Sequence, residues 1–173
     1  LIMKKHNIKF VVQTSTMKDL VRGVYGIESV VLPFFDLSYL YNTGAKKIYD
    51  FIYPASGEFH KNHRNLVKAL VHLSCLGYYP SLLLTLDRDA YTSLYEWIED
   101  VRDSYHLKIF LQSSNYSGMS LLYSESKALI YPSYFESFGL PLIEANYLGL
   151  DILASESDYV RDIVKPTYTF NPS

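Results

Sequence analysis

Two carboxylates eight residues apart are the first residues of this sequence whose types and spacing suggest chemistry. Glu136 is followed by Gly139, Pro141 and then Glu144. Pro141 suits the first turn of a helix, where its missing N–H has no partner, and Gly139 allows the backbone to approach a ligand closely. The free N–H groups at the start of such a helix bind anions. The pattern therefore indicates an anion site at a helix start, flanked by two acidic side chains.

Neither carboxylate is expected to hold the anion itself, because like charges repel. Glu136 and Glu144 are better suited to accept hydrogen bonds from hydroxyl groups, which a nucleotide sugar offers on both its ribose and its hexose. A simpler alternative exists for Glu144, because an acidic residue near the start of a helix complements the helix dipole. The joint pattern of two carboxylates, glycine and proline, directly after segment 128–133, favours the binding site.

The elements that must position these residues alternate between strand-like and helix-like runs. Apolar stretches typical of buried strands occupy residues 8–13, 29–32, 47–53, 81–86, 107–112, 128–131 and 151–154. Helices are expected around residues 66–73, 94–101, 119–124 and 141–148. The alternation predicts an α/β fold with a doubly wound parallel sheet. In such a sheet ligands bind at the carboxyl ends of the strands, where the two carboxylates follow a strand.

The segment from Glu136 to Glu144 resembles the Glu-x7-Glu motif of family 4 of the retaining glycosyltransferases, which have the two-Rossmann-domain architecture called GT-B. The similarity continues through residues 145–154. Upstream, residues 52–62 look like the first strand and phosphate loop of the family's donor-binding domain. The resemblance covers nearly the whole chain, and the Glu-x7-Glu segment is its specific part. It implies a Rossmann-like C-terminal domain, one half of a GT-B enzyme.

The resemblance also implies a division of the chain. Residues 11–14 and 30–33 resemble the end of the N-terminal domain and the linker, and residues 33–44 carry the turn residues Pro33, Asn42 and Gly44. We therefore expect residues 1–44 to be the remnant of an N-terminal domain with the interdomain linker. Residues 45–173 are then the nucleotide-sugar-binding domain. Both ends of the chain look cut, and a C-terminal helix is expected to be truncated.

Individual roles follow from the matching positions. Glu136 would contact the donor hexose, and Glu144 would accept hydrogen bonds from the ribose hydroxyls. Lys61 matches the family lysine that neutralises the diphosphate, so Glu136 and Lys61 are the expected catalytic residues. Taken alone, Lys61 is equally well explained as a solvated lysine at a helix start. The expected donor-binding residues are Glu144 together with His60, Ser137, Phe138, Gly139 and Leu140.

The sequence departs from the family pattern near the phosphate loop. Members of the family place an arginine near the lysine, whereas His60 is the neighbour here and Ser56 stands where others carry arginine. Either His60 supplies a weaker, pH-dependent cation, or the charge of the leaving group is stabilised less well. For the nucleobase, the loop after segment 107–112 offers Gln112 and Ser113, with no feature that selects uracil, guanine or adenine.

Composition excludes several other classes of protein. The net charge is −2, so no basic field attracts nucleic acid. Cys75 is alone, which excludes an internal disulfide and fits a reducing compartment. No apolar run is long enough to be a transmembrane segment, and no signal peptide opens the chain. We expect a soluble cytoplasmic domain, with the inner face of the cell membrane as an alternative place for the full-length protein.

One short sequence pattern is similar to a metal-binding motif. Residues 87–89 copy the Asp-x-Asp that other glycosyltransferases use to hold a divalent metal, but their position between a strand and a helix favours a turn or helix cap. The resembled family does not need that metal. No metal and no other cofactor is therefore expected beyond the nucleotide sugar, which is the donor substrate.

The resemblance implies transfer of a sugar from a nucleoside diphosphate sugar to a saccharide or lipid-linked acceptor, with retention, in the synthesis of bacterial surface polysaccharides. The acceptor is expected to bind through the N-terminal half, so the isolated chain would bind donor nucleotide and turn over nothing. Two alternatives stay open. One is a sugar-nucleotide epimerase on the same fold, which needs no acceptor. The other is a non-catalytic nucleotide-sugar-binding domain whose site has decayed, suggested by Ser56 and His60.

Overall fold

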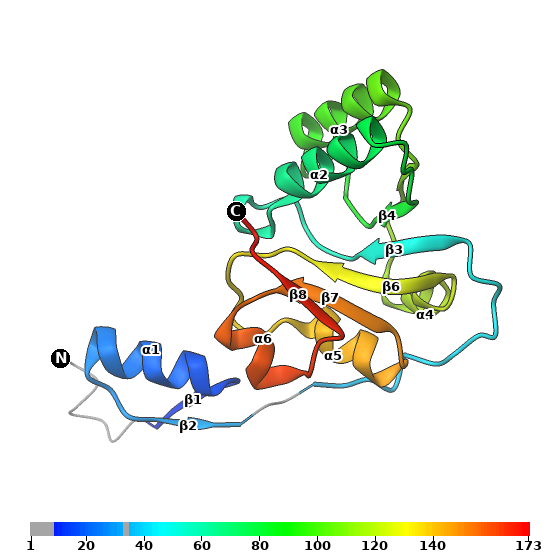
Figure 1. The fold of residues 1–173 in the computed structure, drawn as a ribbon. Coiled ribbons are helices and arrows are strands. Elements are labelled where there is room, and N and C mark those ends of the chain that lie inside the picture. Colours follow the sequence, from blue (N-terminus) through cyan, green and yellow to red (C-terminus); the bar gives the residue numbers. More distant parts are fainter. Residues whose placement is uncertain (1–8, 33–34) are drawn as a thin grey trace.

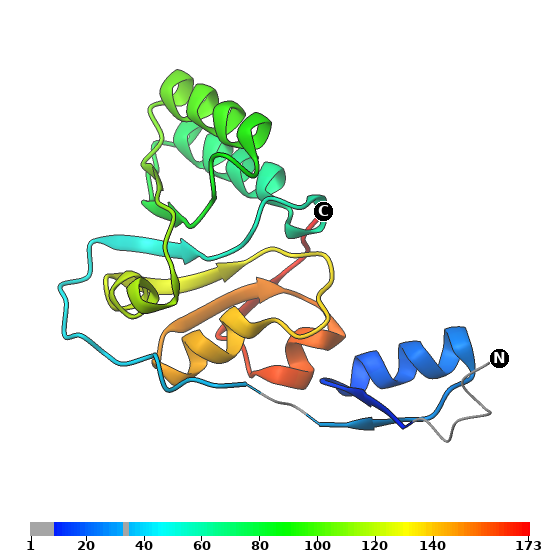
Figure 2. The same cartoon turned by 180° about the vertical axis from the view of Figure 1, so that it is seen from behind.

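The computed structural model describes residues 9–32 and 35–173, and its strands form two separate parallel sheets (Figures 1 and 2). In the smaller sheet β1 (Phe10–Val12) pairs with β2 (Ser29–Val31), and α1 (Ser15–Tyr25) connects the two strands. Asp162 holds the start of α1, because its Oδ2 accepts hydrogen bonds from the backbone N–H and the hydroxyl of Thr16, both at 2.7 Å. The smaller sheet is therefore attached to the larger unit through the first turn of α1.

The larger sheet has six strands in the order β5-β4-β3-β6-β7-β8, all parallel to their neighbours. The strands are β3 (Tyr49–Tyr53), β4 (Leu82–Leu84), β5 (Ile109–Leu111), β6 (Ser126–Tyr131), β7 (Asp151–Ser155) and β8 (Tyr168–Phe170). The helices between them are α2 (His63–Cys75), α3 (Thr92–Tyr105), α4 (Tyr116–Ser124), α5 (Leu140–Tyr147) and α6 (Asp158–Ile163), and the short 3-10 helix η2 (Phe59–Lys61) precedes α2.

The strand order makes the sheet doubly wound. The chain moves outward from β3 to β4 and β5 and then returns past β3 to continue through β6, β7 and β8. In Figures 1 and 2, α2 and α3 lie together on one side, and α5 and α6 lie on the other. The predicted fold class is thus confirmed. The direction of winding reverses between β3 and β6, and the loops that leave such neighbouring strands diverge to open a ligand crevice.

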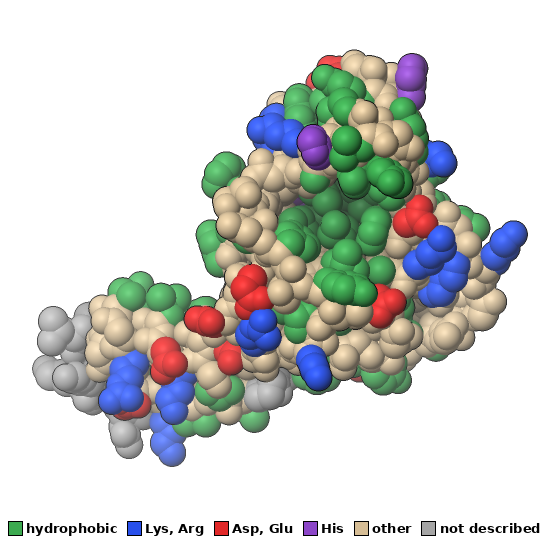
Figure 3. Space-filling model, in the orientation of Figure 1, with side chains coloured by type: hydrophobic (Ala, Val, Ile, Leu, Met, Phe, Trp, Pro, Cys, Tyr) green, Lys and Arg blue, Asp and Glu red, His purple; other side chains and the backbone are tan. Residues whose placement is uncertain are grey.

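The core explains why the central strands are apolar nearly throughout. Ile52, Leu83 and Leu129 are fully buried, as expected where helices cover both faces of a parallel sheet. α2 adds Leu66 and Leu70, which share one helix face by their spacing. Figure 3 shows further hydrophobic side chains, in green, where the surface is hollowed below α2 and α3. The sheet is therefore a firm support for the loops at its carboxyl edge.

All seven predicted strands are present. Five are shorter than predicted by one to three residues, whereas β6 begins two residues earlier and β7 ends one residue later; Ile8 of the first prediction lies outside the described residues. Four elements of the described residues were missed, namely α1, the 3-10 helix η2, α6 and β8. The apolar residues Met17, Leu20, Val21 and Val24 have helical spacing and carry the signal for α1. α6 has six residues and β8 has three, so neither is long enough to show a period.

The predicted division near residue 44 stays a prediction, and Pro33, one of its turn residues, lies outside the described residues. Across residues 9–32 and 35–173, no helix combines the length and the apolar character needed to span a bilayer.

Candidate nucleotide-sugar site

The candidate site lies where the loops after β3 and β6 meet, at the reversal point of the sheet. These loops are tied together, since the backbone N–H of Tyr134 donates to the carbonyl of His60 at 2.9 Å. The side-chain amide of Asn62 donates to the carbonyl of Pro132 at 3.1 Å. Asn62 is buried and adopts a left-handed conformation with φ 61°, which turns the chain from η2 into α2. The phosphate-loop segment and the Glu-x7-Glu segment are therefore held side by side.

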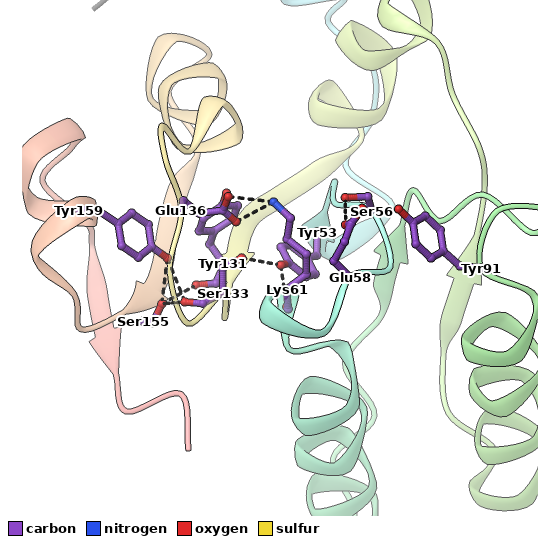
Figure 4. A network of polar contacts seen from close by, with 10 residues as sticks. All are labelled: Tyr53, Ser56, Glu58, Lys61, Tyr91, Tyr131, Ser133, Glu136, Ser155 and Tyr159. Atoms are coloured by element: carbon purple, nitrogen blue, oxygen red, sulfur yellow. Dashed lines mark hydrogen bonds and ion pairs between the residues drawn. The ribbon is translucent and has the colours of Figure 1, made fainter. Parts of the chain in front are cut away.

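Lys61 and Glu136 form an ion pair across these two loops (Figure 4). The Lys61 Nζ lies 2.8 Å from Oε1 and 2.9 Å from Oε2 of Glu136. Only 16% of the lysine side chain and 8% of the glutamate side chain are exposed. Lys61 is thus not the solvated lysine that was its alternative explanation. The structure brings the two predicted catalytic residues into contact although 75 residues separate them.

Several hydroxyl groups next to this ion pair form hydrogen bonds with the backbone of the two loops that carry it (Figure 4). The Tyr53 hydroxyl donates to the carbonyl of Lys61 at 2.7 Å and lies 2.8 Å from the Ser133 hydroxyl. The carbonyl of Ser133 accepts hydrogen bonds from Ser155 at 2.6 Å and from Tyr159 at 2.9 Å. Burial raises the pKa of Tyr53 well above its usual range and that of Tyr159 to about 12, so both hydroxyls stay protonated donors.

Sequence reasoning missed these supporting residues, although a signal was present. Tyr53 is the last residue of β3, Tyr131 the last of β6 and Ser155 the last of β7, and all three are buried. A hydroxyl at the carboxyl end of three neighbouring apolar strands marks a polar layer beneath a ligand crevice. Buried hydroxyls need hydrogen-bond partners, and here Tyr53 and Ser155 donate to backbone carbonyls of the two site loops, those of Lys61 and Ser133.

Glu144 lies in the second turn of α5 and is only 5% exposed. Its Oε2 accepts a hydrogen bond of 2.6 Å from the Tyr123 hydroxyl, and its Oε1 accepts one from the Tyr39 hydroxyl. A carboxylate that complements a helix dipole belongs in the first turn. Glu144 instead accepts hydrogen bonds from two tyrosine hydroxyls, and its role as acceptor for the ribose stays a prediction.

Gly139 is the N-cap residue immediately before α5, and its conformation explains why glycine is required. Its φ is +70°, and a Cβ at this position would lie 3.1 Å from Leu142 Cδ1 and 3.3 Å from Ile163 Cδ1. Pro141 falls in the first turn, as predicted. Pro141 has no N–H, and the Leu142 N–H donates to the Gly139 carbonyl at 3.0 Å. Within the described part of the chain, the free backbone donors at the start of α5 are therefore those of Gly139 and Leu140, beside Glu136.

The remaining predicted donor-binding residues lie around this centre. Ser137 is exposed, Leu140 is partly buried, and the Phe138 ring lies 6.1 Å from the ring of Phe35. The His60 ring stacks on Phe135, with centroids 4.8 Å apart and an interplanar angle of 19°. This contact holds the imidazole flat against an aromatic face beside the loop that carries Glu136.

Ser56, which stands where family members carry arginine, donates its hydroxyl to Glu58. Glu58 also accepts from the Tyr91 hydroxyl. Burial opposes ionisation of Glu58, but these hydrogen bonds and the nearby Lys61 ammonium outweigh it and lower the pKa of Glu58 to about 2. The position is thus occupied by a hydroxyl bound to a carboxylate, and it adds no positive charge.

The predicted base-binding residues Gln112 and Ser113 are exposed and follow β5 directly. Their loop leads into α4, whose first residue, Tyr116, packs edge-on against Tyr39 with centroids 5.4 Å apart. Because Tyr39 also contacts Glu144, this loop ends next to the candidate ribose acceptor. The predicted base and ribose positions therefore lie on the same side of the sheet.

A hollow of about 800 Å³ lies on the other side of the phosphate loop, between the starts of α2 and α3. Glu58, Phe59, His63, Tyr91 and Tyr134 are among its lining residues, whereas Lys61, Glu136 and Glu144 are not. Within the described part of the chain, neither ring nitrogen of the buried His63 has a hydrogen-bond partner. Burial, reinforced by Lys61, lowers the pKa of His63 to about 4.

The Asp-x-Asp sequence forms a turn. The Asp87 carboxylate accepts a hydrogen bond from the backbone N–H of Ala90 at 2.8 Å, and α3 begins only at Thr92. No cluster of three or more potential metal ligands occurs among the residues that the structure describes. The Asp87 side chain thus closes the turn before α3, and the expectation that no metal is needed stays a prediction.

Comparisons with known proteins agree with this geometry. Residues 42–170 match the family described as Glycosyl transferases group 1. The O-antigen chain mannosyltransferase RfbU of Salmonella typhimurium is 25% identical over 157 residues, which are 86% of this chain and 42% of that protein.

Among solved structures, a sucrose-phosphate synthase from Thermosynechococcus elongatus has a TM-score of 0.74 and 20% identity, covering 94% of this chain and 45% of its own. The pneumococcal O-GlcNAc transferase GtfA, solved with UDP and GlcNAc, has a TM-score of 0.70 and 19% identity, covering 95% and 34%. The chain spans less than half the length of each of these relatives.

Proposed function

The chain belongs to the group 1 glycosyl transferases, and on this premise we propose that it is the donor-binding half of a retaining enzyme. The enzyme transfers a sugar from a nucleoside diphosphate sugar to a saccharide or lipid-linked acceptor. The six-stranded sheet is one half of a GT-B fold, in which the partner half supplies the acceptor side. Since the acceptor side lies in the partner half, this chain binds the donor and does not turn over alone.

The buried pair of Lys61 and Glu136 is the observation that carries this proposal. A glycosyl diphosphate presents two different groups next to each other, an anionic diphosphate and a neutral hexose rich in hydroxyls. An ammonium 2.8 Å from a carboxylate, beside the start of α5, matches that order of groups. In the proposed complex the diphosphate lies on Lys61 and the free N–H groups of α5, and Glu136 accepts hydrogen bonds from the hexose.

The same arrangement accounts for the chemistry. When the bond between the sugar and the diphosphate breaks, negative charge grows on the leaving oxygen. Fixed positive groups at that oxygen stabilise the transition state more than the ground state. Lys61 and the helix start supply them, so the proposal requires no metal. Glu144, on the side of the Gln112–Ser113 loop, takes the ribose hydroxyls.

The relatives support the substrate class. One relative is an O-antigen chain mannosyltransferase, and GtfA was solved with UDP and GlcNAc. We extend this to a hexosyl donor and to a place in bacterial surface polysaccharide synthesis, in the cytoplasm or at the inner face of the membrane.

Nucleotide binding measured by calorimetry tests the donor site. UDP, GDP and ADP are titrated into this chain, into Lys61→Ala and into Lys127→Ala. Lys127 is the matched control, because its Nζ also lies 2.8 Å from a carboxylate, that of Asp50, at the opposite end of the sheet. We expect one nucleotide to bind wild type and Lys127→Ala equally. Lys61→Ala should bind it about tenfold or more weakly, since hydrogen bonds to charged groups contribute about 1.5–3 kcal/mol.

Equal binding by both variants would remove Lys61 from the diphosphate site. The transfer reaction itself is tested on the full-length protein, with NMR of the product to read the anomeric configuration. Conversion of the sugar nucleotide without an acceptor would identify an epimerase instead.

A further inference from the structure

Both oxygens of the Glu144 carboxylate are occupied by tyrosine hydroxyls that come from different parts of the fold. Tyr123 belongs to the last turn of α4, and Tyr39 belongs to the segment between the two sheets. The tyrosines satisfy a carboxylate that is almost completely buried, where a charge without partners would be costly. Each oxygen of Glu144 therefore already has one hydroxyl donor before any nucleotide arrives.

The two tyrosines differ in how firmly they are held. The Tyr123 ring is completely buried in the core, and burial together with the neighbouring Glu144 raises its pKa well above the usual range. Tyr39 is only partly buried, and its ring packs against Tyr116, which is itself largely exposed. Tyr123 is thus a permanent partner of Glu144, whereas Tyr39 stands on the solvent side of the carboxylate.

The backbone around Tyr39 is anchored independently of its hydroxyl. The Ser120 hydroxyl donates to the carbonyl of Tyr39 at 2.9 Å and accepts from the backbone N–H of Tyr41 at 3.2 Å. Leu40, between them, is buried in the core. The Tyr39 side chain can therefore leave Glu144 by rotating about its own bonds while the segment stays in place.

We propose that the Tyr39 hydroxyl occupies the ribose position on Glu144 in the empty site and competes with the nucleotide for it. The inference rests on the proposed function, since it assigns the ribose to Glu144. A ribose hydroxyl and a tyrosine hydroxyl are the same kind of donor to the same carboxylate oxygen. Binding exchanges one hydrogen bond for another, and Tyr39 lowers the affinity for every ligand that needs Oε1.

The competition also sets a selectivity. A ligand that carries ribose hydroxyls must displace Tyr39. A 2′,3′-dideoxy ligand has no ribose hydroxyl to donate to Glu144, so it leaves Tyr39 in place. Removing the Tyr39 hydroxyl should therefore help only the first kind of ligand. A general loosening of the segment would affect both kinds alike.

The test uses Tyr39→Phe, which keeps the ring against Tyr116 and removes only the hydroxyl. Calorimetric titration compares the nucleotide that binds wild type best with its 2′,3′-dideoxy analogue. We expect Tyr39→Phe to bind the ribonucleotide about three- to tenfold more tightly, a part of what a charge-assisted hydrogen bond contributes. Binding of the dideoxy analogue should stay within twofold of wild type.

Two variants act as references. Tyr41→Phe changes an exposed tyrosine of the same segment and should leave both affinities unchanged. Tyr123→Phe removes the permanent partner of Glu144 and should weaken ribonucleotide binding, the opposite sign from Tyr39→Phe.

The outcomes separate the two levels of the argument. If wild type binds none of UDP, GDP or ADP, the proposed donor site fails, and the competition fails with it. If wild type binds a nucleotide and Tyr39→Phe binds it equally or more weakly, the donor site stands and the competition is refuted. An equal gain in affinity for the ribonucleotide and the dideoxy analogue would also refute it, because the gain would then not depend on a hydrogen bond between the ribose and Glu144.

Discussion

β3 and β6 carry a lysine–carboxylate pair near each end, and the two pairs differ in burial rather than in distance. At the carboxyl end Lys61 and Glu136 are 2.8 Å apart, with 16% and 8% of their side chains exposed. At the amino end Lys127 and Asp50 are also 2.8 Å apart, with 62% and 36% exposed. The two pairs therefore have the same distance but different burial. Ligands of such sheets bind at the carboxyl ends of the strands, where only the pair of Lys61 and Glu136 lies.

Replacing the two lysines in parallel is expected to give the largest difference. Lys61→Met leaves the Glu136 charge buried without its partner, which should lower the free energy of unfolding by about 3 kcal/mol. Lys127→Met removes an exposed pair and should cost at most about 1 kcal/mol. Urea unfolding of both variants measures the effect. A cost of similar size for the two lysines would show that burial does not separate the pairs.

Acidification should lower the free energy of unfolding through groups at the two ends of β3 and β6, in a different pH range for each end. The pKa of His63, near the carboxyl end, is lowered to about 4 by burial and by Lys61. The unfolded chain binds that proton first as the pH falls below about 6.5, so stability should drop by about 2 kcal/mol between pH 7 and pH 5. The hydrogen bond from Lys127 is the main cause that lowers the pKa of Asp50 to about 2. The stability that ionised Asp50 contributes to the fold is therefore lost only below about pH 4.

Unfolding at pH 7 and pH 5 measures this loss in wild type, in His63→Leu and in His72→Gln. His72 is exposed in the last turn of the same helix and serves as the control. The loss should disappear in His63→Leu and persist in His72→Gln. A loss that persists in His63→Leu would assign the acid sensitivity to another group.

The smallest expected difference concerns the two ends of α5. Gly139 and Gly149 both have φ near +70°, but a Cβ would crowd Leu142 and Ile163 only at Gly139, and it would meet nothing within 4 Å at Gly149. Gly149→Ala should cost about 1 kcal/mol from backbone strain alone, and Gly139→Ala about 2 kcal/mol. Thermal unfolding compares them, and equal costs would mean that the crowding at Gly139 relaxes freely.

Much of the fold was predictable, because period and composition are local properties. The runs that became β3, β4 and β6 are apolar nearly throughout, and the spacing of Leu66 and Leu70 identified α2. α6 and β8 were not predictable in this way, since each is shorter than the period that would reveal it. α1 was missed although Met17, Leu20 and Val24 carried its spacing.

The sequence by itself determined the residue types of the candidate site. The glycine, proline and two glutamates between 136 and 144 are close in the chain, and their relation depends on the geometry of one loop and one helix. The predicted roles of Lys61, Glu136 and Glu144 remain predictions, to be decided by the titrations above.

Only the tertiary structure decided which partners these residues meet. Lys61 contacts Glu136 across 75 residues, and Tyr39 contacts Glu144 across 105 residues. The Tyr53 hydroxyl supports both site loops. No local period contains such contacts, because they depend on the order of the strands and on the point where the winding of the sheet reverses. That order brings the carboxyl ends of β3 and β6 together, and the physical environment of every site residue follows from it.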